Sequence, residues 1–170
     1  MYKRQGQLWS TQPVTGPQSF TLQVWFSTTT TSGGKLVGFG GGSGGARSNQ
    51  YDRHIYMLNS GQLSFGVYNG GNQVVTTPYR FNDGRWHLAT ATFSAGTGMA
   101  LYLDGQRMAA NAGVTQAENS TGYWRMGYDN LDGWPNSPAS YWFKGSMAHV
   151  AVFGRVLSGA EVADQYNAGS

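Results

Sequence analysis

Alternating apolar and polar residues run through most of this chain, at the two-residue period that is typical of β-strands. The clearest example is the segment 20–26, which places four apolar residues at every second position: Phe20, Leu22, Val24 and Phe26. Successive side chains of a strand point to opposite faces of its sheet. The segment 20–26 is therefore predicted to be a strand whose phenylalanine face lies in a hydrophobic core.

A second unit, residues 82–105, is central to the rest of the pattern and is predicted to form two adjacent strands. Asp-Gly pairs at 83–84 and 104–105 suit tight turns, because glycine adopts positive φ without a Cβ clash and aspartate tolerates it. Apolar residues alternate through 99–103, so one face of the second strand is predicted to be buried. Two strands alone are marginal in water, and the remaining chain must supply more sheet.

Short alternating segments recur along the whole chain. Further strands are predicted at 35–39, 54–58, 63–67, 73–77, 122–127 and 143–153, with an edge strand or extended arm at 7–19 and a strand followed by a loop in 111–121. Many short strands separated by turn residues are typical of β-sandwiches. The sequence predicts an all-β, two-sheet antiparallel jelly-roll β-sandwich. A single domain is expected over residues 1–170, with residues 1–6 as a non-native or disordered lead.

One helix is predicted, near the C-terminus. Ser158 and Glu161 have the spacing of a capping box, in which each side chain accepts a hydrogen bond from the other residue's backbone N–H. Leu157 and Val162 flank them as a hydrophobic staple. A short helix is therefore expected over residues 159–167, as an accessory to the sandwich.

Composition narrows the class of protein further. The chain has 26 glycines in 170 residues and is 11% charged, where an average soluble domain has about 25% charged residues. This balance suits an extracellular β-protein with many turns. The net charge of +3 comes from scattered side chains, so no nucleic-acid partner is expected. The absence of cysteine excludes disulfides and thiolate metal sites, and no apolar run is long enough for a membrane-spanning helix.

Several segments together resemble the laminin G-like domains of the concanavalin A-like lectin/glucanase superfamily. In order and spacing, the segments that match are Asn82–His87, Met99–Gly105, Gly122–Gly127, Phe143–Met147 and Leu157–Ser158. The resemblance implies a jelly-roll sandwich with a binding rather than a catalytic role, in a secreted, multi-domain bacterial protein. One departure lies in the last strand, where Ala148 and His149 replace the acidic pair usual in the family. This puts in doubt a polar contact near the closing helix.

Catalytic residues are not expected. Retaining glycosidases use two carboxylates about 5 Å apart, which a strand would show as alternating acidic residues. The chain has only two glutamates, of which Glu161 is assigned to the helix cap and Glu118 to a polar loop. No two histidines have zinc-ligand spacing. The chain is therefore predicted not to be an enzyme, and a polysaccharide-degrading enzyme is the less favoured alternative.

Calcium is a possible cofactor on the evidence of one loop. Asp129, Asn130 and Asp132 lie close together in sequence and carry the oxygen ligands that calcium prefers. The resemblance also implies calcium, because family members often bind one ion at the rim of the sandwich. The alternative is that these residues only stabilise turns beside Gly133 and Pro135.

Carbohydrate recognition would rest on aromatic side chains that stack on sugar rings, with amide and charged groups that bond the hydroxyls. The long irregular segment 128–141 is the best candidate, since functional residues concentrate in loops on a rigid scaffold. The predicted contact residues there are Trp134, Tyr128, Asn130, Asn136 and Tyr141, with Tyr51 and Arg53 on an opposite wall formed by residues 43–53. Trp134 has two interpretations, a sugar-stacking residue or an anchor that packs the loop down.

The sequence thus predicts a non-catalytic carbohydrate-binding or adhesion module of a secreted multi-domain bacterial protein. Its partner would be a glycan or an extracellular protein. The alternative from another class is a protein–protein adhesion domain or a structural spacer.

Overall fold

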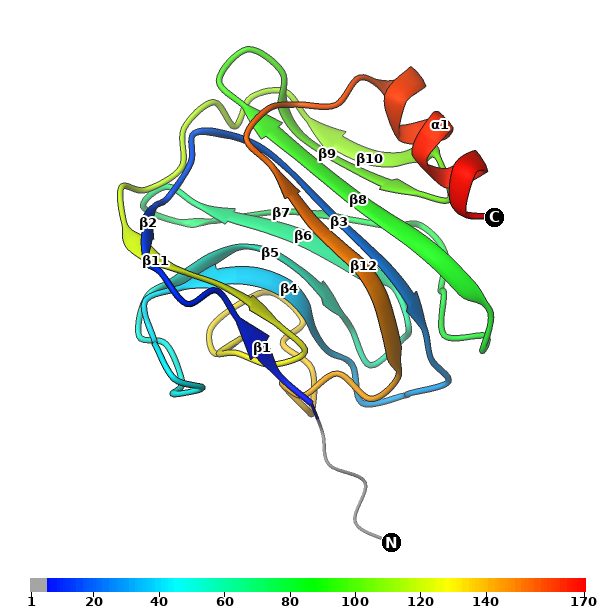
Figure 1. The fold of residues 1–170 in the computed structure, drawn as a ribbon, viewed down its shortest axis with the longest axis horizontal. Helices are drawn as coiled ribbons and strands as arrows, with labels where there is room; N and C mark the ends of the chain where they lie inside the picture. The colour runs from blue at the N-terminus through cyan, green and yellow to red at the C-terminus, as the bar shows by residue number, and fades with distance from the viewer. Residues whose placement is uncertain (1–5) are drawn as a thin grey trace, which may run out of the picture.

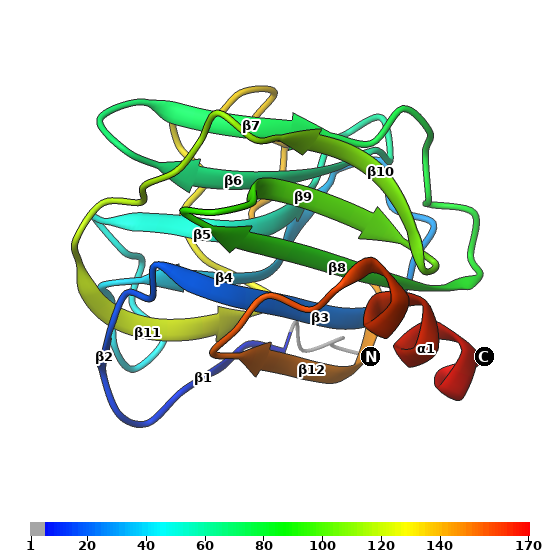
Figure 2. The ribbon, with the colours of Figure 1, turned by 90° about the horizontal axis from the view of Figure 1, so that it is seen from above.

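The computed structural model describes residues 6–170 as two antiparallel sheets packed face to face (Figures 1 and 2). The seven-stranded sheet has the order β1 (Leu8–Trp9), β11 (Thr121–Met126), β4 (Gly34–Gly40), β5 (Tyr51–Met57), β6 (Leu63–Tyr68) and β7 (Asn72–Thr76), and β2 (Val14–Thr15) also pairs with β11. The five-stranded sheet has the order β10 (Gln106–Asn111), β9 (Gly98–Leu103), β8 (Trp86–Ser94), β3 (Ser19–Ser27) and β12 (Ser146–Phe153). The predicted all-β jelly-roll sandwich is confirmed.

The core lies between the sheets and follows the alternation read from the sequence. The apolar face of β3 is fully buried, and the Phe20 ring contacts Phe65 of the opposite sheet edge-on, with ring centroids 6.2 Å apart. Phe20 also packs beside Phe93 of the neighbouring strand β8. Because every second side chain of β3, β8 and β9 enters this layer, a one-residue slip of register would expose the whole set.

Helix α1 (Gly159–Gly169) covers part of the outer face of the five-stranded sheet (Figure 1). Ser158 accepts a hydrogen bond from the Glu161 N–H, and the Glu161 carboxylate accepts one from the Ser158 N–H, so the predicted capping box is confirmed. The Tyr166 ring stacks on Trp25 of β3, with centroids 5.7 Å apart. Within residues 6–170, no helix has the length and apolar character needed to cross a membrane.

One predicted strand is displaced in the structure, and one predicted segment lies outside the described residues. The prediction of a strand within 111–121 is wrong, because the strand here is β10, which begins at Gln106 directly after the turn. Asp104 and Gly105 both have positive φ (53° and 79°), which makes a tight hairpin, so pairing with β9 resumes at once. The lead predicted for residues 1–6 lies, apart from Gly6, outside the described residues.

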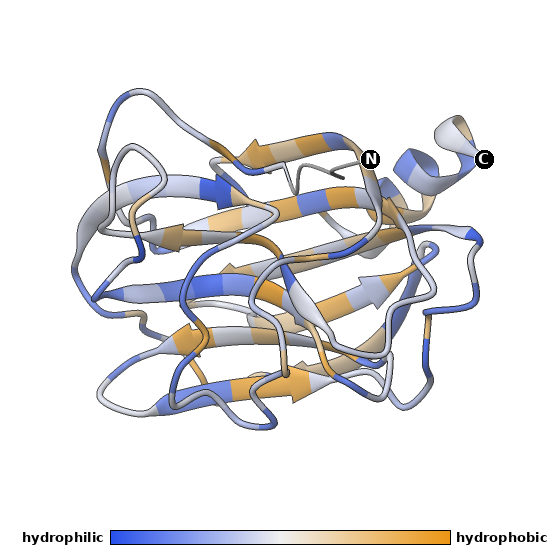
Figure 3. Cartoon of the chain, turned by 90° about the horizontal axis from the view of Figure 1, so that it is seen from below, coloured by the Kyte–Doolittle hydropathy of each residue, from blue (hydrophilic) through white to orange (hydrophobic). Residues whose placement is uncertain are grey.

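Long irregular segments cross the outer face of the seven-stranded sheet, as the view from below shows (Figure 3). The largest of them is residues 127–143, which we call the covering loop. Its ends are close together, since the Phe143 N–H donates to the Gly127 carbonyl over 2.9 Å. A compact segment with adjoining ends is an Ω-loop, a form that frequently carries function.

Candidate functional site

The covering loop meets a second irregular segment, residues 41–50, which we call the rim loop. The Asn130 side-chain amide donates to the Ser48 carbonyl over 2.9 Å, and the Arg47 guanidinium donates to Asn130 Oδ1 over 2.8 Å. The Tyr51 hydroxyl, at the start of β5, donates to the Asp132 carbonyl over 2.7 Å. The structure therefore brings together the two segments in which the sequence predicted opposite walls of a site.

Trp134 lies inside the covering loop with its side chain turned toward the sheet. It is only 5% exposed, and its ring meets His54 edge-on with centroids 4.2 Å apart. Below it is Gly66 of β6, where a Cβ atom would fall 2.5 Å from the Trp134 ring. The structure thus corrects the prediction that Trp134 offers a face to sugars, because that face packs on the sheet and anchors the loop.

Hydrogen bonds to loop carbonyls hold the covering loop in place. The Tyr56 hydroxyl donates to the Pro135 carbonyl over 2.9 Å, and the Asn72 amide donates to the Gly133 carbonyl over 2.7 Å. Burial raises the pKa of Tyr56 to about 12, so the phenol stays protonated and remains a donor. The outer face of the sheet is therefore closed by a fixed cover, and a ligand must meet the molecule at its margin.

Arg53 does not line a surface wall. It is fully buried and pairs with Asp52 over 2.7 Å, and it also donates to the Pro17 and Glu118 carbonyls. This corrects the prediction for Arg53. A positive φ of 43° at Arg53 marks a local irregularity in β5, which simple alternation does not reveal.

Arg47 lies at the surface near the position expected for Arg53. Its side chain is half exposed, and its guanidinium lies 5.3 Å from the centre of the Tyr141 ring. The Asp132 carboxylate is 3.9 Å away. Sequence reasoning missed Arg47, because it follows a glycine-rich stretch with no periodic pattern.

A shallow cavity of about 350 Å³ opens beside this junction and is the candidate site, which we call the rim pocket. Tyr51 and Tyr68, both half-buried, form its aromatic part. Its polar groups come from both loops and from neighbouring segments: Asn49, Gln50, Asn72, Glu118 and Asp132. Two phenol rings surrounded by amides and carboxylates match the chemistry of a polyhydroxylated ligand, which offers C–H faces and hydroxyl groups.

Two ionisable groups of the rim pocket are shifted toward their neutral forms. Partial burial, with the charge of Asp132 second, raises the pKa of the Tyr51 phenol. Partial burial and the nearby Asp52 carboxylate raise the pKa of Glu118. Both side chains lie in the lining of the pocket, where they can form hydrogen bonds to a ligand.

The other predicted contact residues lie outside the rim pocket. Tyr128 is half-buried and stacks on Trp142 with centroids 4.1 Å apart, and Tyr141 lies under Arg47. Asn136 is exposed with a φ of 52°, which is a turn role that asparagine tolerates. Of the seven side chains predicted to contact sugar, only Tyr51 and an edge of Trp134 line the cavity.

The predicted calcium ligands do not present a common set of oxygens. Asp129 is fully buried, whereas the Asp132 side chain is 74% exposed and lies near the Arg47 cation. Asn130 Oδ1 already accepts from Arg47 and from the Asp132 N–H. Across residues 6–170, no three acidic, histidine or cysteine side chains are grouped as metal ligands. These residues do not fit a calcium ion, and we derive no role from one here.

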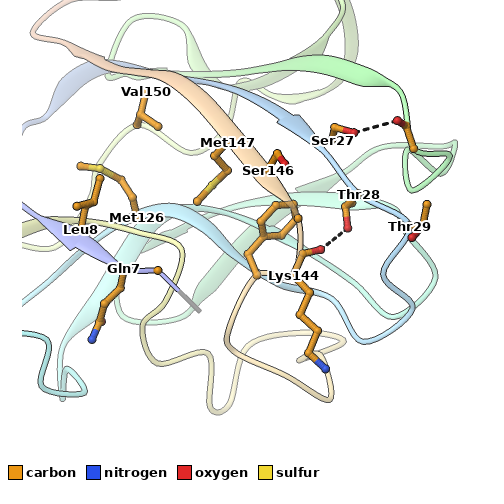
Figure 4. Close-up of a pocket in the computed structure, with 14 residues that line it drawn as sticks. Gln7, Leu8, Ser27, Thr28, Thr29, Met126, Lys144, Ser146, Met147 and Val150 are labelled. Carbon is orange, nitrogen blue, oxygen red and sulfur yellow. Dashed lines mark hydrogen bonds between the residues drawn. The ribbon is translucent and has the colours of Figure 1, made fainter. Parts of the chain in front are cut away.

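A larger cleft than the rim pocket, about 1040 Å³, lies elsewhere, between the edges of the two sheets. Figure 4 shows Leu8 and Met126 of the seven-stranded sheet facing Met147 and Val150 of β12 across it. Its walls are largely apolar, and Lys144 is the only charged side chain among the residues that line it. Among the residues that line it, the one aromatic side chain, Phe143, is buried and there is no carboxylate, so this cleft is a poorer candidate for a sugar than the rim pocket.

The fold is that of the lectin-like jelly rolls: two antiparallel sheets pack face to face, and loops cover the outer face of the larger sheet. The chain belongs to the concanavalin A-like lectin/glucanases superfamily, whose family model matches residues 4–163. The predicted resemblance is therefore confirmed. No curated protein matches the chain in sequence.

Solved structures share the fold at low sequence identity. A heptameric SAP-like pentraxin from Limulus polyphemus is 17% identical with a TM-score of 0.66, over 96% of this chain and 76% of that one. The CBM40 of a Ruminococcus gnavus IT-sialidase, in complex with α2,3-sialyllactose, is 18% identical with a TM-score of 0.63, over 89% and 84% of the two chains. The binding domain of a botulinum neurotoxin of serotype D/C is 14% identical with a TM-score of 0.61, over 90% of this chain and 37% of that one. At these identities the likeness establishes the fold alone.

Proposed function

We propose that this domain is a non-catalytic carbohydrate-binding module and that it binds glycans at the rim pocket. The observation that carries the proposal is the placement of Tyr51 and Tyr68 beside amide and carboxylate groups at the margin of a closed face. Support also comes from the fold, because similar structures include a CBM40 solved with a sialylated sugar. The binding would be shallow, through aromatic stacking and hydrogen bonds.

The same residues argue for binding without turnover. The acidic side chains at the rim pocket are Glu118 and Asp132, which come from different loops. Asp132 is largely exposed, and its carboxylate lies 3.9 Å from the Arg47 guanidinium. Glycoside hydrolysis needs one carboxyl as a proton donor and a second as nucleophile or base on either side of the bond. The expected result with common polysaccharides is binding and no release of reducing sugar.

The proposal is tested on a glycan array, followed by titration calorimetry with the best ligand. Replacing Tyr68 with phenylalanine removes its hydroxyl and keeps the packing against Leu131 and Trp134, whereas replacing it with alanine removes the ring, for which we expect the affinity to fall about tenfold or more. Tyr79, which is 68% exposed and lies beyond the opposite end of β7, provides the control. If Tyr68→Ala, Tyr79→Ala and the unchanged chain bind the glycan with equal affinity, the rim pocket is not the binding site.

Calcium stays a prediction and is tested in the same experiment. The array is repeated with chelator and with added calcium. Because the predicted ligands do not converge, we expect the bound glycans and their affinities to be the same in both conditions. A glycan retained only with calcium would reinstate the metal and require ligands other than this trio.

We further propose an extracellular setting as part of a longer bacterial protein, supported by the low charge of the chain and its similarity to binding modules. Protein–protein adhesion is the second candidate. Its support is a set of exposed apolar side chains on the edge strands β1 and β2, namely Leu8, Trp9 and Val14, which are 68%, 38% and 41% exposed. Absence of any glycan binding at millimolar concentration would favour this second function.

A further inference from the structure

The charged side chains that line the rim pocket have one sign. They are Glu118 and Asp132, and among the described residues that line the pocket none is a lysine, an arginine or a histidine. The Asp132 side chain is 74% exposed and Glu118 is half-buried, so both lie where a ligand can meet them. The whole chain has a net charge of +3. A pocket whose charged groups are carboxylates is therefore a local exception.

Two cations lie behind the wall of the pocket, and both are fully buried. Arg53 donates to both oxygens of Asp52, over 2.7 and 3.0 Å. Lys35 Nζ lies 5.6 Å from the centre of the Tyr51 ring. Burial lowers the pKa of Lys35 to about 8, and the carboxylates of Asp129 and Asp52 act in the opposite direction. Each of these cations thus has carboxylates nearby in the interior, and neither is exposed to a ligand.

Arg47 is the half-exposed cation near the pocket, and its contacts turn it toward the covering loop. Its guanidinium donates to Asn130 Oδ1 over 2.8 Å and lies 5.3 Å from the centre of the Tyr141 ring. The Asp132 carboxylate is 3.9 Å from it, so a ligand would compete with that carboxylate for the same charge. Arg47 does not line the cavity.

The two carboxylates of the pocket have room to accept hydrogen bonds. The bonds that fix Glu118 are made by its backbone, whose N–H donates to the Tyr68 carbonyl and whose carbonyl accepts from Arg53. Asp132 is likewise held through its carbonyl, which accepts from the Tyr51 hydroxyl over 2.7 Å. Neutral sugar hydroxyls can donate to these carboxylates, whereas an ionised acid offers acceptors only.

An acidic sugar bound in this pocket would therefore meet like charges. Proteins usually hold a carboxylate or a sulfate with arginine, lysine or several N–H groups, and like charges placed side by side disfavour the wrong partner. We propose that the rim pocket selects glycans without acidic groups, and that Glu118 and Asp132 determine this selectivity by repelling carboxylates and sulfates. The inference rests on the glycan-binding function proposed above and adds the class of ligand.

The test compares glycans in pairs that differ in charge. Each neutral glycan on the array is scored against its acidic counterpart, with lactose and sialyllactose, galacto-oligosaccharides and oligogalacturonates, and manno-oligosaccharides and oligomannuronates among the pairs. At low salt we expect the neutral member to bind about fivefold or more tightly. The difference should shrink in high salt, because mobile ions screen repulsion between exposed charges. Exclusion by shape alone would not respond to salt.

Two substitutions that keep the shape of the side chain assign the effect to its residues. Glu118→Gln and Asp132→Asn should each lower the ratio of neutral to acidic affinity about two- to threefold in calorimetric titrations. Asp164→Asn removes the same charge from an exposed position on α1 and is the matched control, which should leave the ratio unchanged. If a variant at the pocket is unstable, the salt series on the unchanged chain decides.

Failure of this inference is distinguishable from failure of the proposed function. Acidic members that bind as tightly as their neutral partners, or more tightly, would overturn the selectivity and leave glycan binding in place. A neutral preference that is the same at low and high salt would also overturn the role of the two carboxylates. If no glycan on the array binds, the proposed function fails and the selectivity fails with it.

Discussion

The outer faces of the two sheets are covered in different ways. Over the seven-stranded sheet, the covering loop packs Trp134 against His54 above a layer of buried charges. Over the five-stranded sheet, helix α1 packs Tyr166 against Trp25, and the buried polar contact below is the uncharged pair Gln23–Thr90. The first cover makes many hydrogen bonds to the sheet, whereas the second depends on the aromatic stack and on Thr21 of β3, which hydrogen-bonds to Arg155 and Leu157 just before the helix.

This difference separates two roles. The helix closes a surface of uncharged side chains, among them Trp25 and the hydrogen-bonded pair Gln23–Thr90, and a short amphipathic segment is sufficient for that task. The loop closes a polar surface, where each buried group requires a partner and the geometry is fixed by many bonds. A fixed loop edge can hold Tyr51 and Asp132 in one arrangement, which is what a shallow binding site requires.

The largest effect is expected from breaking the buried pair below the loop. Asp52→Asn leaves the Arg53 charge buried without an anion, and we expect the free energy of unfolding to fall by about 3–5 kcal/mol. Burial raises the pKa of Asp52 even though Arg53 acts in the opposite direction. Desolvation of the two charges is therefore unfavourable, and it is no longer offset when one partner is removed. Urea denaturation measures the change. Asp164→Asn, at an exposed position, is the control, and equal losses for both variants would contradict the assignment.

A loss of similar or slightly smaller size is expected at Trp134. Trp134→Ala empties the space above Gly66, and we expect about 3–4 kcal/mol of lost stability, with faster amide exchange through residues 127–143. Trp86→Ala provides the contrast, because Trp86 is 50% exposed and should change stability by less than about 0.5 kcal/mol. Unchanged exchange in the loop would show that Trp134 is not its anchor.

The helical cover is expected to contribute less. Tyr166→Ala removes the stack on Trp25, and we expect about 1–2 kcal/mol of lost stability, with the amide exchange of α1 accelerated and that of the sheets unchanged. Hydrogen exchange followed by mass spectrometry resolves the two covers separately. If Tyr166→Ala lowers the free energy of unfolding by more than Trp134→Ala does, the helical cover contributes more than the loop, and the comparison is contradicted.

The smallest effect concerns pH and lies at the end of the five-stranded sheet. His87 has a carboxylate oxygen beside each ring nitrogen, Asp104 Oδ2 at 2.7 Å and Asp83 Oδ1 at 3.0 Å, so both nitrogens act as donors only in the imidazolium. The hydrogen bond to Asp104 is the main cause that raises the pKa of His87, while the Arg85 N–H bond lowers the pKa of Asp83.

The sign of the pH dependence follows from these directions. The contribution of His87 is fully present below its unfolded pKa of about 6.5 and is lost as pH rises through the raised folded value. The contribution of Asp83 is present at higher pH and is lost as pH falls through its lowered value. Stability measured from pH 5 to 8 should decline in the unchanged chain by more than in His87→Gln. Parallel curves for the two would show that the imidazolium is absent.

The fold was predictable because its signal is local. Alternation at 20–26 and the Asp-Gly turns determine strands and faces within a few residues of themselves, and the capping box at Ser158 does the same for α1. The strand β10 was missed because its six residues show no regular alternation of apolar and polar positions and its position depends on the turn at Asp104. A strand whose position is determined by pairing with the preceding strand cannot be recognised from the periodicity of its own residues.

The site was predictable only in outline. The sequence indicated the two loops, and Tyr51 does line the pocket, but whether Trp134 or Arg53 faces solvent depends on partners far away in the chain. Trp134 requires the absent side chain of Gly66, and Arg53 requires carbonyls at Pro17 and Glu118. Buried charge runs against the usual preference of such residues for the surface, so composition gives no warning of it.

The most direct test of the central claim is an amide chemical-shift map of the chain with the best ligand from the glycan array. The account predicts that shifts concentrate at Tyr51, Tyr68, Asn72 and Asp132, around the rim pocket, with none along β3 and α1. Shifts concentrated instead at Leu8, Met126 and Met147, in the cleft between the sheet edges, would contradict it.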